Sequence, residues 1–162
     1  MIVRRLGRDH LGAMRALNAV FGRAFEDPDA YAGDPPPDSW LTEQLGKDAL
    51  IALIAERDGA VIGGLVAYEL DKLEQARREL YIYDLAVEEA HRRRGVATAL
   101  IDWLREHAAA RGAWVIYVQA DLGDEPAIAL YTNLGVREDV LHFDIAPAAQ
   151  GRTISQPTAA SG

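Results

Sequence analysis

Two long runs of β-forming residues, 49–57 and 60–70, are separated only by Asp58-Gly59. This dipeptide tolerates positive φ angles and is a strong signal for a two-residue hairpin turn. The sequence therefore predicts an antiparallel pair of long strands in the middle of the chain.

The segments around this hairpin predict a mixed α/β fold. Apolar residues at helical spacing over 10–25 predict an amphipathic helix capped by Asp9. The other expected elements are an N-terminal strand, a short helix over 39–45, strands over 79–87, 113–120 and 138–145, and helices over 95–111 and 125–134, the last capped by Asp124 with Pro126 in its first turn. This order predicts a central mixed sheet with helices on both faces.

Length and composition predict one domain. The 162 residues are 49% hydrophobic, which suits a single core over residues 1–146. Residues 147–162 turn to Ala, Gly, Ser, Thr and Gln and are expected to form a flexible tail. No apolar run is long enough to cross a bilayer and no signal peptide is recognisable, so we expect a cytoplasmic protein without a membrane partner.

The charge and the missing cysteines narrow the function. There are 17 Lys and Arg against 25 Asp and Glu, a net charge of −8. This balance argues against a nucleic-acid partner, whose affinity comes largely from basic contacts to phosphate, and favours cationic partners. The absence of cysteine excludes a cysteine nucleophile and thiolate metal sites, and the four histidines show no metal-ligand spacing, so no metal is expected.

A basic cluster nevertheless stands between a strand and a helix. Arg92-Arg93-Arg94-Gly95 follows the 79–87 strand and opens the next helix. Free N–H groups at a helix N-terminus favour anions, a glycine lets the backbone approach a phosphate, and arginines add charge-assisted hydrogen bonds. The segment lacks the Gly-Lys-Ser/Thr of a nucleotide P-loop. On these residues alone, a pyrophosphate cradle and an exposed basic loop capping a helix remain equally open.

Further segments add a family resemblance. Arg92-x-x-Gly95-x-Ala97 after a strand is similar to the signature of the GCN5-related N-acetyltransferases (GNATs), and Ala127-x-x-x-Tyr131-x-x-x-Gly135 resembles a later helix of that family. Residues 81–87, 117–121 and 142–145 resemble the gentamicin-type aminoglycoside 3-N-acetyltransferases. The resemblance implies the GNAT fold, with a mostly antiparallel central sheet. It also implies acetyl-CoA as donor, a cationic aminoglycoside as acceptor, antibiotic resistance as outcome, and a possible homodimer.

The resemblance assigns the donor site to two segments. They are the strand end Leu85, Ala86 and Val87, and the loop and first helical turn Arg92, Arg93, Arg94, Gly95, Val96, Ala97 and Thr98. It implies that the pantetheine pairs with the strand and that a backbone N–H near Leu85 or Ala86 stabilises the oxyanion.

Two residues are candidates for the proton transfers. Asp84 is an ionisable residue in an otherwise apolar strand, so it is either a structural hydrogen-bond acceptor or a site residue that binds or deprotonates the substrate amine. Tyr131 stands where the family often keeps the tyrosine that protonates the leaving thiolate, although a packed core tyrosine is the alternative. The predicted substrate carboxylates are Glu79, Asp84, Asp121 and Asp144.

Two other functions fit the same residues. A GNAT enzyme could acetylate a polyamine, a peptide or a small metabolite, because a fold does not fix a substrate. A non-catalytic acyl-CoA-binding module is the other possibility.

Overall fold

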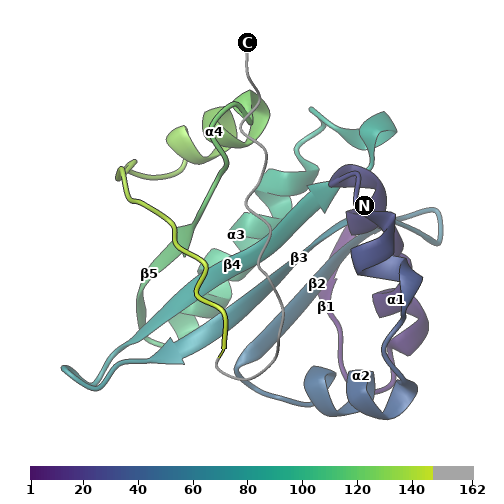
Figure 1. The fold of residues 1–162 in the computed structure, drawn as a ribbon, viewed down its shortest axis with the longest axis horizontal. Coiled ribbons are helices and arrows are strands. Elements are labelled where there is room, and N and C mark those ends of the chain that lie inside the picture. Colours follow the sequence, from purple (N-terminus) through teal and green to yellow (C-terminus); the bar gives the residue numbers. More distant parts are fainter. Residues whose placement is uncertain (148–162) are drawn as a thin grey trace. The chain divides into compact units, whose positions relative to one another are not determined.

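The computed structural model describes residues 1–147, which fall into two compact units, Met1–Gly123 and the residues from Asp124 onward. The first unit contains a five-stranded sheet in the order β1-β2-β3-β4-β5 (Figure 1). Its strands are β1 (Ile2–Arg5), β2 (Leu50–Arg57), β3 (Ala60–Asp71), β4 (Arg78–Val87) and β5 (Ala113–Val118). Neighbours pair antiparallel except β4 and β5, which are parallel. The mixed, mostly antiparallel sheet confirms the predicted fold class.

Helices cover both faces of this sheet, as Figure 1 shows. Helices α1 (Leu11–Ala24) and α2 (Asp38–Leu45) pack on one face, and α3 (Val96–Ala110) packs on the other. The first layer is a cluster of buried side chains that includes Leu17 and Phe21 of α1 and Val66 of β3. Helix α1 sits very close to the sheet, since a Cβ at Gly64 would lie 2.4 Å from Leu17 Cδ1. Among residues 1–147, no helix is both long and apolar enough to cross a membrane.

The predicted hairpin is confirmed. Asp58 has φ 52° and Gly59 has φ 79°, so both turn residues are left-handed, as the short hairpin turn requires. The turn joins β2 to β3 in a ladder that runs from Leu50 opposite Tyr68 to Arg57 opposite Ala60.

Two sequence predictions are wrong. Helix α1 begins after His10 and not after an Asp9 cap; the ring Nδ1 of His10 accepts the N–H of Gly7 at 2.8 Å. The strand expected over 138–145 does not form in the described part of the chain. Its apolar residues, including Phe143, are exposed. An alternating pattern makes a strand only where a second strand completes the hydrogen-bond ladder, and this segment pairs with no strand within residues 1–147.

The described part of the second unit contains one helix, α4 (Glu125–Thr132). The Asp124 side chain accepts the N–H of Ala127 at 3.1 Å, and Pro126 occupies the first turn. The predicted cap is therefore confirmed. The expected flexible tail lies, from residue 148 onward, outside the described residues.

A buried carboxylate ties the sheet to the end of α3. Glu69, on β3, is only 9% exposed. Arg111, directly after α3, donates Nε and Nη2 to its two oxygens at 2.8 and 2.7 Å, and Arg78 Nε of β4 lies 3.3 Å away. The hydrogen bonds from Arg111 lower the pKa of Glu69 below its ordinary value. The network anchors the sheet to the C-terminal end of α3, whereas Gly95 precedes its N-terminal end.

We expect Glu69→Gln to lower the free energy of unfolding by about 1–3 kcal/mol at pH 7, because it removes the charge that the arginines share. Since the folded pKa is lowered, this stabilisation is present above the unfolded pKa and is lost as the pH falls through the folded pKa. Urea unfolding at pH 7 and at low pH measures the effect. Glu106→Gln, at an exposed position of α3 that forms no ion pair within residues 1–147, is the matched control. A loss that persists unchanged at low pH would exclude the charge as its cause.

Candidate active site

Strand β4 contains a β-bulge in its middle, which shifts the alternation of its side chains between the two faces of the sheet. Val66 of β3 lies opposite Asp84, but the next residue, Ala67, lies opposite Ile82, so Tyr83 is an extra residue in β4. Such a bulge places two successive side chains on the same face. Ile82 is buried among core residues, whereas the Tyr83 ring stacks edge-on against Tyr68. The bulge thus brings Asp84 onto the sheet face that α1 and α2 cover.

The bulge also marks the point where β4 and β5 separate. The parallel ladder with β5 ends at Ile82, so β5 pairs with no residue of β4 beyond that point. At the far end, Glu88 donates its N–H to the Ile62 carbonyl at 2.9 Å. Strand alternation then directs the N–H groups of Ala86 toward β3 and of Leu85 and Val87 toward the open side. This free edge can accept an extended chain as an added strand, and it favours Leu85 over Ala86 as the donor to an oxyanion.

The loop after β4 leads into α3 through two left-handed residues. Arg93 has φ 58° and Gly95 has φ 77°, and a Cβ at Gly95 would have no neighbour within 4 Å. The first intrahelical bond runs from Ala99 N–H to the Gly95 carbonyl. The amides of Val96, Ala97 and Thr98 therefore precede the helical ladder. The segment 95–98, which we call the cradle, thus offers an exposed glycine, backbone N–H groups without a partner in the helix, and the positive end of the helix dipole. These features fit a bound pyrophosphate.

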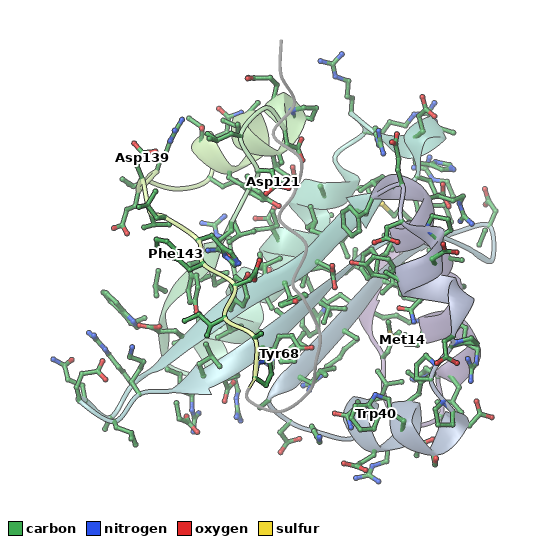
Figure 2. The ribbon with its side chains drawn as sticks, viewed as in Figure 1. Met14, Trp40, Tyr68, Asp121, Asp139 and Phe143 are labelled. Carbon is green, nitrogen blue, oxygen red and sulfur yellow. The ribbon has the colours of Figure 1, made fainter. Side chains whose placement is uncertain are left out.

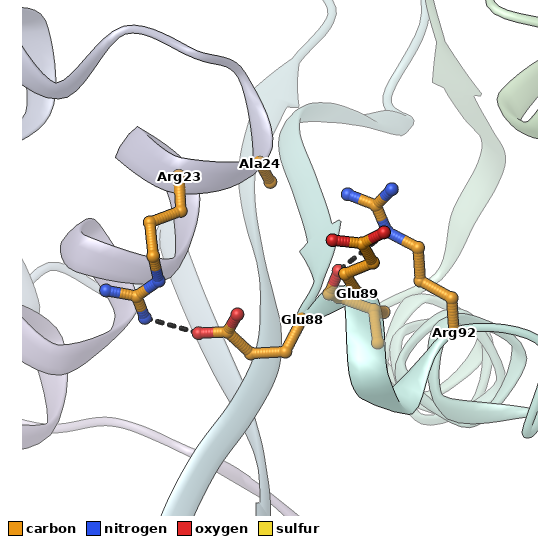
Figure 3. Close-up of a pocket in the computed structure, with 6 residues that line it drawn as sticks. Arg23, Ala24, Glu88, Glu89 and Arg92 are labelled. Carbon is orange, nitrogen blue, oxygen red and sulfur yellow. Dashed lines mark hydrogen bonds and ion pairs between the residues drawn. The ribbon is translucent and has the colours of Figure 1, made fainter.

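A pocket adjoins this loop at the end of β4 (Figure 3). Arg92 lines it and donates Nε to the Val87 carbonyl at 3.1 Å. Arg23, in the last turn of α1, pairs with Glu88 across the pocket. All three predicted arginines are exposed, and of the three Arg92 is the one that hydrogen-bonds to the strand end within residues 1–147. Arg23 is a basic residue that the sequence analysis missed, since only the fold brings α1 to this loop.

Asp84 opens into a groove between α1, α2 and the sheet. Met14, Trp40 and Tyr68, which Figure 2 labels, line the same groove. Burial raises the pKa of Asp84 above the ordinary carboxylate value, and a hydrogen bond from Tyr31 offsets part of this shift. A half-buried carboxylate of raised pKa is suited to hold an ammonium group or to take its proton.

The partner of Asp84 is a second residue that the sequence analysis missed. Tyr31 lies in a π-helical turn, Asp29–Gly33, and its hydroxyl donates to Asp84 Oδ1 at 2.7 Å. The surrounding segment is polar and rich in turn residues, so no periodicity points to Tyr31. The contact spans 53 positions and is visible only in the fold.

Two predicted carboxylates of the first unit lie elsewhere. Glu79, near the start of β4, accepts the indole N–H of Trp114 at 3.1 Å and pairs with Lys72 at 3.5 Å. Five residues of strand, about 17 Å, separate Glu79 from Asp84. Asp121 follows β5 and is exposed. Glu79 is therefore not brought to Asp84, and the role of both carboxylates as substrate ligands stays a prediction.

Tyr131 and Asp144 belong to the second unit. Burial, and after it the charge of Asp124, raises the pKa of Tyr131 to about 12. This makes Tyr131 a weaker acid than an ordinary phenol of pKa about 10. Asp144 is exposed and lies 3.1 Å from His142 Nε2. Their roles as general acid and substrate ligand stay predictions. Within residues 1–147, no three metal-ligating side chains cluster into a metal site.

Residues 15–136 match the acetyltransferase (GNAT) family. The chain belongs to this family. The matched range contains the whole strand-loop-helix segment from Arg78 to Ala110. Members of the GNAT family use acetyl-CoA, and the cradle and the free β4 edge of this member fit that donor.

Two solved structures resemble this GNAT member over nearly its whole length. An aminoglycoside acetyltransferase from an uncultured soil metagenomic sample is 54% identical, with a TM-score of 0.89, over 91% of this chain and 98% of that one. A second such enzyme from an uncultured soil metagenomic sample, in complex with sisomicin, is 26% identical, with a TM-score of 0.84, over 90% of this chain and 95% of that one.

A curated relative carries a different substrate name. The ribosomal protein bS18-alanine N-acetyltransferase of Salmonella typhimurium is 30% identical over 73 residues, 45% of this chain. The chain spans about half the length of the curated relatives it matches.

Proposed function

We propose that this chain transfers the acetyl group of acetyl-CoA directly to an amine of an aminoglycoside, the 3-amino group of gentamicin-type compounds. The observation that carries the proposal is the 54% identity, over 91% of the chain, with a solved aminoglycoside acetyltransferase. Acetylation removes one positive charge from the drug, which weakens its binding to an anionic target and makes the host resistant. In this proposal the enzyme is cytoplasmic.

The chain's own groups meet the demands of this reaction. The amides from Gly95 to Thr98 hold the pyrophosphate, and Arg92 adds a charge-assisted hydrogen bond. The Leu85 N–H faces the open edge of β4 and stabilises the oxyanion that forms when the amine attacks the thioester. Asp84 binds the substrate ammonium and takes its proton, because a neutral amine is required for attack.

The remaining steps concern the second unit and the acidic surface. Tyr131 is the proposed donor of a proton to the leaving thiolate, although its raised pKa counts against it. The net charge of −8 steers a polycation toward the protein. Asp121, Asp144 and Glu79 are further candidate ligands for the substrate amines, and a homodimer remains part of the proposal.

A protein N-terminus is the second candidate acceptor. It is favoured by the match of 73 residues to the bS18-alanine N-acetyltransferase. A polyamine or a small metabolite would use the same donor site. In the remaining alternative, a non-catalytic module, acetyl-CoA would bind without turnover.

Thiol release from acetyl-CoA distinguishes these functions. We expect fast turnover with gentamicin or sisomicin and little with spermidine, an alanine-terminated peptide or a lysine-containing peptide. NMR of the product then identifies the acetylated amine. Turnover only with the alanine-terminated peptide would replace the antibiotic by a protein acceptor. Tight acetyl-CoA binding with no turnover of any of these amines would favour the non-catalytic module.

A further inference from the structure

The ring of Tyr31 is held in place by the end of α1. Its centroid lies 5.8 Å from the Phe21 ring and 5.6 Å from the Phe25 ring. A Cβ at Gly22 would lie 3.3 Å from both Tyr31 Cβ and Pro28 Cα, so the bare glycine lets the turn approach the helix. The ring therefore has little freedom to rotate away from its position.

The hydroxyl of this ring reaches one oxygen of Asp84. It donates to Oδ1 at 2.7 Å, while Oδ2 accepts no hydrogen bond from any side chain or backbone group of residues 1–147. Burial raises the pKa of Tyr31 far above that of a free phenol, so the hydroxyl remains a donor over the whole working pH range. One carboxylate oxygen is thus fixed and the other is available to a substrate.

We propose that Tyr31 is a positioning residue that orients the Asp84 carboxylate so that Oδ2 takes a proton from the substrate ammonium. The N–H bond of the ammonium breaks, an O–H bond forms at Oδ2, and the neutral amine keeps the electron pair with which it attacks the acetyl carbonyl. The inference rests on the proposed function, because it assigns Asp84 the proton transfer.

Among the phenols around Asp84, Tyr31 is the one that contacts the carboxylate directly. The charge of Asp84 interacts with three phenols, namely Tyr31 from the π-helical turn, Tyr68 from β3 and Tyr81 from β4 itself. Of these three, Tyr31 alone donates a hydrogen bond to Asp84. The hydrogen bond favours the ionised carboxylate, whereas burial opposes it.

Tyr31→Phe tests the proposal because it removes the hydroxyl and keeps the ring. We expect kcat with gentamicin to fall about 10- to 100-fold, the size of a lost hydrogen bond to a charged group. The KM for acetyl-CoA stays unchanged. Without the hydrogen bond the pKa of Asp84 rises, so the acid limb of the pH–rate profile moves to higher pH. Tyr117→Phe removes a phenol that makes no hydrogen bond within residues 1–147, and it is expected to leave rate and profile unchanged.

Two further measurements separate this inference from the proposed function. In an Asp84→Asn background, Tyr31→Phe should add little to the loss, since both changes remove the same step. Carboxyl NMR titration follows the pKa of Asp84 without any substrate. An Asp84 pKa that is the same with and without the Tyr31 hydroxyl overturns the inference even if gentamicin is a good substrate. If Tyr31→Phe raises the pKa of Asp84 above its wild-type value but the wild-type protein acetylates none of the tested amines, the positioning contact is supported and the proposed function is overturned instead.

Discussion

Gly95→Asp is expected to abolish acetyl-CoA binding while the protein still folds. Gly95 has φ 77° and a Cβ there would meet no atom within 4 Å, so the backbone can carry the new side chain where the pyrophosphate is expected. A negative charge about 4 Å from a phosphate charge costs about 4 kcal/mol at an effective dielectric constant near 20. This corresponds to a loss of roughly a thousandfold in affinity.

Calorimetric titration with acetyl-CoA measures this loss, and Gly112→Asp is its matched control. Gly112 has φ 71° and open space as well, but it follows the opposite end of α3. Both substitutions introduce the same charge and the same backbone strain, so they differ only in their distance from the cradle. Equal acetyl-CoA affinity in the two variants would remove Gly95 from the donor site.

Asp84→Asn is expected to lower turnover by about 10²- to 10⁴-fold, the range for loss of a general base. Asparagine keeps an oxygen that can accept from Tyr31, so the loss follows from the charge and not from the packing. Acetyl-CoA affinity stays near the wild-type value, because Asp84 lies on the groove side of the bulge and not in the cradle. Steady-state kinetics and titration of the donor separate the two effects.

The same substitution is expected not to lower thermal stability. The pKa of Asp84 is raised in the folded protein, so its ionisation opposes folding. The contribution of Asp84 to the free energy of unfolding therefore falls as the pH rises from the pKa of Asp84 in the unfolded chain through its pKa in the folded protein. Asparagine removes this penalty at neutral pH, whereas Asp102→Asn, at an exposed position in α3, is the control that should change neither turnover nor stability. Wild-type turnover in Asp84→Asn would contradict its catalytic role.

Local patterns predicted most of the fold because they act over short distances. Asp58-Gly59 fixed the hairpin, the side chain of Asp124 capped α4, and the arginine-glycine loop opened α3 where the sequence placed it. The strand expected over 138–145 failed because pairing depends on a distant partner that its own residues do not specify.

The candidate site was predictable only where it is continuous in sequence. Residues 84–98 carry the acidic residue, the free strand edge and the cradle in one segment. Arg23 reaches that segment from α1 by pairing with Glu88, and Tyr31 reaches it from the following turn by its hydrogen bond to Asp84. Such contacts depend on how the first helix packs on the sheet, and no local spacing encodes them.

The extra residue at Tyr83 has a consequence for how this strand can evolve. It divides β4 into two halves of opposite phase, so that Ile82 faces the core and Asp84 faces the groove. Substitutions along the strand change one side chain at a time, but deleting a single residue there would put the two halves back in phase. The carboxylate would then turn toward the α3 side, and the residues after it would exchange faces. We therefore expect relatives with the same chemistry to vary freely in the identity of this residue and to keep the number of residues between Leu80 and Val87 constant.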